Sequence, residues 1–301
     1  MKMNPASAAI SRPGGGAARR NGAAPGRTIK NCGRQLPVYL IVGLGAMLMV
    51  VPLLWALAAS FKSYSDLFTN PYGFLPQQWL WGNYRAVFQA VPFHWFFGNT
   101  LKITLACTAG TLLTSAVAAY AFARLRFPGR DFLFMGYLAT LMIPRQITLV
   151  PTFLIMKWLG LLDNHLSLIL PGLFSAYGTF LLRQFFLTIP FELEEAATID
   201  GCGYLRRFGR IIIPLAKPAL ATLGIFTLMA QWNDYLYPMI FLNSEANRTL
   251  VLGLAIFRGD VDVQWNLLMA AVVLASAPIV IAFLAAQRFF VEGIATVGLK
   301  G

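Results

Sequence analysis

Residues 194–214, EEAATIDGCGYLRRFGRIIIP, lie between two long apolar runs. The stretch begins with two acidic residues and two alanines, is interrupted by Gly201 and Gly203, and continues with alternating basic and apolar residues. The surrounding chain has 301 residues, of which 57% are hydrophobic and 12% are charged, against roughly 25% charged in soluble domains. We therefore interpret the chain as a polytopic membrane protein and this stretch as a loop between two spans.

Six apolar runs approach the roughly 20 residues that a helix needs to cross the hydrocarbon core. Helices suit runs of this length, because backbone polar groups in the bilayer must be paired within their own segment. The sequence thus predicts an all-α fold with six transmembrane helices, the third and fifth of which are interrupted by Arg145 and Lys217. The expected spans are residues 36–60, 99–123, 132–156, 165–187, 211–232 and 267–290.

The distribution of lysine and arginine predicts the orientation. If the N-terminus lies inside, 17 of the 24 basic residues fall on the inner side and six on the outer side. Inner loops carry the excess of positive charge, so both termini are expected in the cytoplasm. Residues 1–35 are rich in Gly, Ala, Pro and Arg and lack the apolar content to fold, which favours a disordered basic cytoplasmic tail. Residues 36–301 then form the membrane domain, with a cytoplasmic loop at 190–212.

The loop itself has the pattern of a short helix and a turn. Pro190 precedes three glutamates within residues 192–195, and acidic side chains in a first turn complement the helix dipole. The alanines at 196–197 favour a helix and let another surface approach closely. Gly201 is expected to end the helix with a positive φ. This pattern fits either a docking element or a plain surface hairpin.

The spacing of the loop resembles the signature loop of ABC-importer permeases: Glu-Ala-Ala, three residues, Gly, nine residues, then Ile-x-Ile-Pro. Ile213 stands where the family usually has Leu. Further segments occur in the order typical of the maltose-type (carbohydrate) permeases, so the resemblance covers most of residues 40–301. These segments are NTLKITL, AYAFARLRFPGRD, LMIPRQITLVP, GLLDNHLSLILP, QWNDYLYPMIFL and the terminal GLKG.

The resemblance implies a type I importer permease fold, with a core of five helices and an additional first helix, in the bacterial plasma (inner) membrane. It implies a heterodimer with a second permease, two cytoplasmic ATPase subunits, an extracytoplasmic solute-binding protein and a sugar substrate. The loop would be a coupling helix that fits a cleft on the ATPase. The ATPase contacts expected from this resemblance are Glu194, Glu195, Ala196, Ala197, Asp200 and Gly201.

No enzyme chemistry is expected of this chain. It has no GxxxxGK[ST] phosphate loop, so ATP and Mg²⁺ are expected on the partner ATPase subunits and no cofactor on this chain. Its three cysteines are far apart and its two histidines cannot form a metal cluster alone, so neither a catalytic nor a metal site is predicted.

A membrane enzyme would need clustered acids or histidines beside the spans. A secondary transporter would show inverted repeats and buried acids, and an ABC permease for a non-sugar solute stays open as an alternative.

Polar residues near two spans are candidates for the substrate path. Arg145 lies within the third apolar run between two prolines, where an isolated charge costs about 2.5–3.5 kcal/mol on insertion scales. It is expected to face either substrate hydroxyls or freed backbone carbonyls, and Gln146 shares both interpretations. Asn233 and Asp234 at the outer end of the fifth span either line the path or cap a helix.

Overall fold

The computed structural model describes residues 27–71, 73–258 and 263–298, and every regular element in these ranges is a helix. The chain divides into two units, Met1–Leu53 and Leu54–Gly301. Helix α1 (Arg27–Ala59) begins in the first unit and ends in the second, and its part Pro37–Ala59 is long and apolar enough to cross a membrane. The predicted tail, residues 1–35, lies mostly outside the described residues, and the backbone is helical from Arg27 onward.

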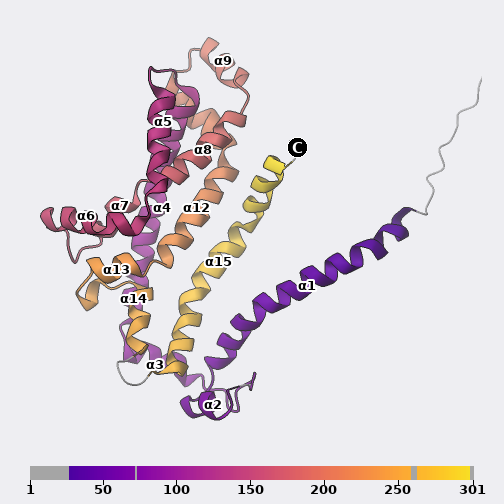
Figure 1. Ribbon diagram of the computed structural model, residues 1–301, viewed down its shortest axis with the longest axis vertical. Coiled ribbons are helices and arrows are strands. Elements are labelled where there is room, and N and C mark those ends of the chain that lie inside the picture. Colours follow the sequence, from indigo (N-terminus) through magenta and orange to yellow (C-terminus); the bar gives the residue numbers. More distant parts are fainter. Residues whose placement is uncertain (1–26, 72, 259–262, 299–301) are drawn as a thin grey trace, which may run out of the picture. The chain divides into compact units, whose positions relative to one another are not determined.

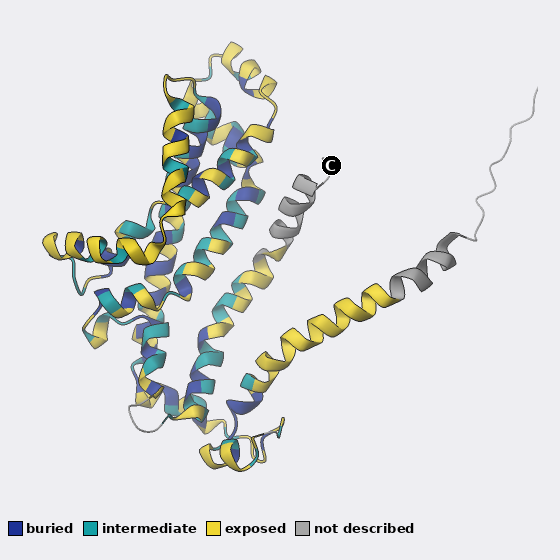
Figure 2. Cartoon of the chain, viewed as in Figure 1, coloured by how far each residue is buried: buried dark blue, intermediate teal, exposed yellow. Residues whose placement is uncertain are grey.

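Four long helices run side by side in the second unit: α4 (Phe93–Arg124), α8 (Ala176–Thr188), α12 (Lys217–Trp232) and α15 (Trp265–Gly298) (Figure 1). Helix α4 packs against α8 and α12, and α12 packs against α15. Alanines supply much of the buried side of α4, and small residues let neighbouring helices approach closely in a membrane. Figure 2 shows this buried side as dark blue along the helices of the bundle.

Further helices connect and cover these four. Before α4 lie α2 (Tyr64–Thr69) and α3 (Gly82–Ala90). Between α4 and α12 lie α5 (Arg130–Ala139), η1 (Thr140–Met142), α6 (Arg145–Trp158), α7 (Leu166–Gly172), α9 (Glu192–Ile199), α10 (Tyr204–Arg207), the π-helical turn η2 (Phe208–Ile212) and α11 (Ile213–Leu215). After α12 come α13 (Leu236–Phe241), η3 (Glu245–Asn247), α14 (Leu250–Leu254) and η4 (Ala255–Arg258).

Within the described residues, four segments are long and apolar enough to span a membrane, and six result if two bent helix pairs each count as one span. The predicted number of six agrees with this total. The four unbroken segments are Pro37–Ala59, Phe93–Arg124, Leu166–Thr188 and Trp265–Ala285.

The predicted third and fifth spans are sharply bent and not continuous helices. The segment ending at Met142 and helix α6 differ in direction by 98°, and Pro144 lies at the break. Proline has no N–H to continue a helix and forces the preceding residue, Ile143, towards an extended conformation. The segment Tyr204–Leu215 and α12 differ by 77° around Ala216.

An aspartate joins two loops at the ends of α6 and α13. Oδ1 of Asp163 accepts hydrogen bonds from the backbone N–H groups of Asn243 and Ser244, both at 2.9 Å, and from the Ser244 hydroxyl at 3.0 Å. The Asn247 amide donates to the backbone oxygen of Asp163 at 2.6 Å. The hydrogen bonds to Oδ1, above all that from the Ser244 N–H, favour the ionised carboxylate and lower the pKa of Asp163 to about 2.

We predict that Asp163→Asn lowers the thermal stability of the purified protein most at neutral pH. Because the folded pKa lies below the unfolded value of about 3.9, the ionised form contributes stability above that value and loses it as the pH falls towards about 2. The difference in Tm between wild type and variant should therefore shrink below about pH 4. Glu245→Gln, which removes an exposed carboxylate from the same loop, is the control. A gap between wild type and Asp163→Asn that is constant from neutral pH to pH 3 would contradict this account.

Candidate functional site

The loop between α8 and α12 carries helix α9 at one end of the bundle (Figure 1). Its first turn holds Glu192, Glu194 and Glu195, whose charges are favourable at the positive end of the helix dipole. The helix begins at Glu192, after Phe191, so that Pro190 precedes it and is not part of its first turn, where the sequence pattern predicts it. It is outside the segments that are long and apolar enough to span a membrane.

Gly201 ends α9 with a φ of +77°, which confirms the predicted positive φ. The N–H of Cys202 donates to the oxygen of Ala197 at 2.8 Å, and the N–H of Gly201 donates to that of Thr198 at 3.0 Å. Together these bonds form a Schellman motif, a common helix ending that favours glycine in the left-handed conformation. A Cβ added to Gly201 would meet no atom within 4 Å. The backbone conformation, and not a lack of space, therefore selects glycine here.

Most of the predicted contact residues in this loop are accessible. Glu195, Ala196, Asp200 and Gly201 are exposed, and Ala197 is partly exposed. A smooth, small-residue segment outside the apolar spans offers a partner protein a close approach.

Two large apolar side chains extend this accessible surface. Ile199 and Leu205 each keep 87% of their surface exposed. They were not among the predicted contacts, although an isoleucine and a leucine in a polar loop were a usable signal. Exposed apolar side chains of this size in one loop indicate an interaction surface.

Glu194 differs from the other predicted contact residues, because it is 3% exposed. Its carboxylate lies 3.2 Å from the Arg124 guanidinium and accepts a hydrogen bond from the Tyr120 hydroxyl at 3.2 Å. The carboxylate therefore points into the bundle, while the helix that carries it lies at the surface.

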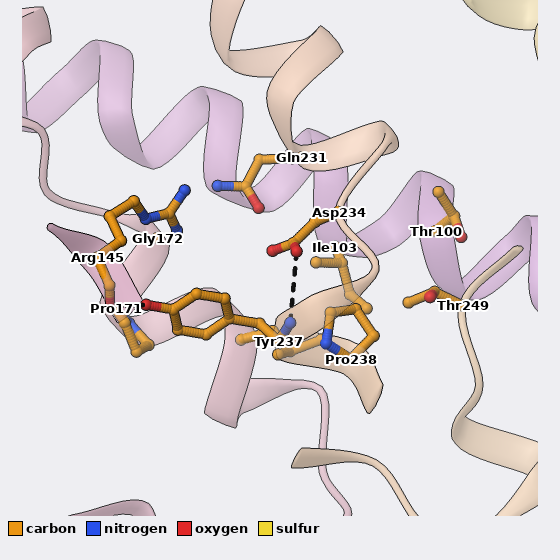
Figure 3. Close-up of a pocket in the computed structure, with 11 residues that line it drawn as sticks. Thr100, Ile103, Arg145, Pro171, Gly172, Gln231, Asp234, Tyr237, Pro238 and Thr249 are labelled. Carbon is orange, nitrogen blue, oxygen red and sulfur yellow. Dashed lines mark hydrogen bonds between the residues drawn. The ribbon is translucent and has the colours of Figure 1, made fainter. Parts of the chain in front are cut away.

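A small pocket lined by both apolar and polar residues lies where α4, α6, α7, α12 and α13 meet (Figure 3). Its cavity volume is about 20 Å³, which is enough for a water molecule and too small for a sugar ring. The pocket is lined by Thr100, Ile103, Arg145, Leu168, Pro171, Gly172, Gln231, Asp234, Tyr237, Pro238 and Thr249.

Arg145 and Asp234 are brought together at this pocket by Tyr237. The Arg145 guanidinium carbon lies 4.9 Å from the centre of the Tyr237 ring, and the Tyr237 hydroxyl donates to the backbone oxygen of Arg145 at 3.2 Å. The N–H of Tyr237 donates to Asp234 at 3.4 Å, as the dashed line in Figure 3 marks. Burial raises the pKa of Asp234, while the Tyr237 N–H and the charge of Arg145 act in the opposite direction. The group can both donate to and accept from a polar solute.

Comparison with known proteins identifies the family. Residues 36–296 match the model of the family described as "Binding-protein-dependent transport system inner membrane component". The chain belongs to this family. It is a permease subunit of an ABC importer, as the sequence predicts, and an inner-membrane component whose transport depends on a binding protein.

Relatives of this permease are similar to it in sequence over most of its length. It is 36% identical over 271 residues to the "Probable ABC transporter permease protein YurM" of Bacillus subtilis (strain 168), covering 89% of each chain. It is 36% identical over 270 residues to the "sn-glycerol-3-phosphate transport system permease protein UgpE" of Yersinia pestis bv. Antiqua, covering 87% of this chain and 96% of that one. A chain in the crystal structure of a bacterial ABC transporter involved in the import of the acidic polysaccharide alginate matches with a TM-score of 0.78 at 26% identity, over 89% of the permease and all of that chain.

The permease places its four predicted path residues differently. The exposed Arg145 and the half-buried Asp234 line the pocket, whereas Gln146 and Asn233, which are also exposed, do not line it. Asn233 donates its amide to the backbone oxygen of Met229 at 2.8 Å, as expected of a residue at a helix end. Gln231 and Tyr237 also line the pocket; neither was predicted, although both lie close to Asn233 and Asp234 in the same segment of the sequence.

Proposed function

We propose that this permease moves a sugar or oligosaccharide across the bacterial inner membrane, driven by ATP that two separate cytoplasmic subunits hydrolyse. The observation that carries the proposal is α9: a short, accessible helix outside the apolar spans, ended by a glycine that fixes its direction. Such a helix offers an ATPase a binding surface. Because α9 lies between α8 and α12 in the chain, this surface is connected to both helices.

In this proposal the ATPase contacts Glu195, Ala196, Ala197, Asp200 and Gly201, together with the exposed Ile199 and Leu205 of the same loop. The buried Glu194 carboxylate faces the bundle and holds the same loop in place. ATP and Mg²⁺ bind to the ATPase subunits, and this chain carries no cofactor. Docking of α9 on the ATPase converts closure of the ATPase dimer into alternating access of the membrane path.

A second permease completes the path as a heterodimer, and an extracytoplasmic solute-binding protein delivers the solute. The small volume of the pocket supports this division, because the pocket in one chain does not hold a sugar. Arg145, Gln146, Asn233 and Asp234 remain the candidates for contact with the solute.

The bias of basic residues supports both termini in the cytoplasm, with residues 1–35 as a basic tail, 36–301 as the membrane domain and α9 on the cytoplasmic side.

The substrate class rests on relatives. The alginate importer carries a polysaccharide and the UgpE protein is named for sn-glycerol 3-phosphate, so a polyol phosphate is the second candidate solute. Hydrogen-bonding groups at the pocket suit hydroxyl-rich solutes of either kind.

Purification of the tagged permease from its native membrane tests the proposal. We expect a second permease and an ATPase to co-purify, and ATP hydrolysis by the reconstituted complex to rise when a solute-binding protein loaded with its sugar is added. A panel of sugars and polyol phosphates identifies the solute class by the same stimulation. Uptake by the permease alone, driven by an ion gradient without ATP, would contradict the proposal.

A further inference from the structure

One buried ion pair joins the loop that carries α9 to the helical bundle. Glu194 of α9 and Arg124 at the end of α4 lie 3.2 Å apart, and their side chains are 4% and 1% exposed. The Tyr120 hydroxyl, one turn earlier in α4, donates to the same carboxylate and lies 3.4 Å from the backbone oxygen of Tyr204 in α10. Glu194 is therefore held from two positions of α4.

Arg124 extends this connection to a third helix. Its guanidinium donates to the backbone oxygens of Phe186 and Ile189, the latter at 2.6 Å, at the C-terminal end of α8. Its guanidinium carbon also lies 4.7 Å from the centre of the Phe191 ring, just before α9. A cation at the C-terminus of α8 is favourable beside the negative end of that helix dipole. One guanidinium thus connects α4, α8 and α9.

Stability alone is a poor explanation for this ion pair. Nε and Nη1 of Arg124 and Oε1 of Glu194 are buried and make no aligned hydrogen bond in the part of the chain that the structure describes. Burying two charges costs desolvation energy, and apolar side chains of similar size often stabilise a fold equally well. Removing one charge would strand the other without a partner, so α9 cannot move away from α4 and α8 without a large penalty.

We propose that Glu194, Arg124 and Tyr120 form a rigid joint that transmits movement of α9 to α4 and α8. The proposal rests on the function proposed above and assigns to Glu194 a positioning role inside the bundle in place of direct contact with the ATPase. ATPase closure moves the exposed surface of α9, and the joint makes α4 and the end of α8 follow. All three are positioning residues, because their side chains are buried inside the bundle and contact one another.

Two variants separate transmission from stability. The double variant Glu194→Leu/Arg124→Met replaces both charges by apolar groups and strands neither. Tyr120→Phe keeps the ring, which packs on Phe208 with 5.1 Å between centroids, and removes only the hydroxyl. Each variant is purified with its partners and reconstituted, and solute uptake is measured per ATP hydrolysed. Thr188→Val, which removes an exposed hydroxyl at the end of α8, is the control.

We expect both variants to bind the ATPase and hydrolyse ATP at the wild-type rate, while uptake per ATP falls about tenfold in the double variant and severalfold in Tyr120→Phe. Wild-type uptake per ATP in an assembled double variant would show that the pair is only structural and would overturn the proposal. If the double variant does not assemble, Tyr120→Phe decides, and an unchanged ratio there overturns it. If the wild-type permease retains no ATPase, the proposed function fails and not this joint alone.

Discussion

Gly201→Val is expected to abolish transport while the permease stays in the membrane at its normal level. At Gly201 φ is +77°, a conformation that a β-branched residue adopts only at a cost of about 1–3 kcal/mol. Valine would favour a different backbone conformation and so break the Schellman bonds from the N–H groups of Gly201 and Cys202. Helix α9 would then point in a different direction, and its surface for the ATPase would be displaced. Insertion should be unaffected, because Gly201 lies outside the apolar spans.

Gly203→Val is the matched control for this prediction. Gly203 has φ −70° and ψ 168°, an extended conformation that valine adopts readily, and a Cβ there also meets no atom within 4 Å. The same substitution two residues away should therefore retain ATPase binding and uptake. Gly201→Asn should fall between the two, since asparagine tolerates the left-handed region better than valine. The amount of permease in the membrane, ATPase co-purification and solute uptake are measured for all three variants. Equal uptake by Gly201→Val and Gly203→Val would contradict the argument.

Arg145→Ala is expected to reduce solute uptake about tenfold without loss of the assembled complex, because the proposed function makes Arg145 a candidate for contact with the solute. The variant removes the cation that lies over the Tyr237 ring and leaves Asp234 without its nearby positive charge. Arg145→Lys should retain part of the uptake, because it keeps the charge and loses the planar guanidinium.

Lys157→Ala is the control for Arg145→Ala, because Lys157 is an exposed cation at the far end of the same helix and does not line the pocket. Uptake and ATPase retention are measured for all three variants. Failure of Arg145→Ala to assemble with its partners, alongside normal assembly of Lys157→Ala, would assign Arg145 a structural role instead.

Local signals in the sequence were enough to predict the loop. Glycine is the residue that most readily adopts a positive φ, so the position of Gly201 after an Ala-rich helix indicated that the helix ends there with a positive φ. The number of apolar runs likewise indicated six spans. The bend at Pro144 also had a local signal, but the sequence does not give its angle of 98° or the contact of α6 with α13.

The burial of Glu194 could not be predicted from the loop alone. In sequence it is one of three neighbouring glutamates, and its partner Arg124 lies in a different helix, 70 positions earlier in the printed sequence. The pairing depends on the packing of α4 against α8, which a loop pattern does not contain. For the same reason the approach of Arg145 to Asp234 through Tyr237 appears only once α6 and α13 are in place.

Photo-crosslinking from α9 is the most direct test of the central claim that this helix docks an ATPase. A photoreactive phenylalanine analogue replaces Ile199, which is 87% exposed, and in a parallel variant replaces Trp158, which is 85% exposed at the end of α6. The account predicts a covalent adduct with the ATPase subunit from position 199 and none from position 158. If the complex still transports solute but position 199 forms no adduct with the ATPase, α9 does not dock the ATPase.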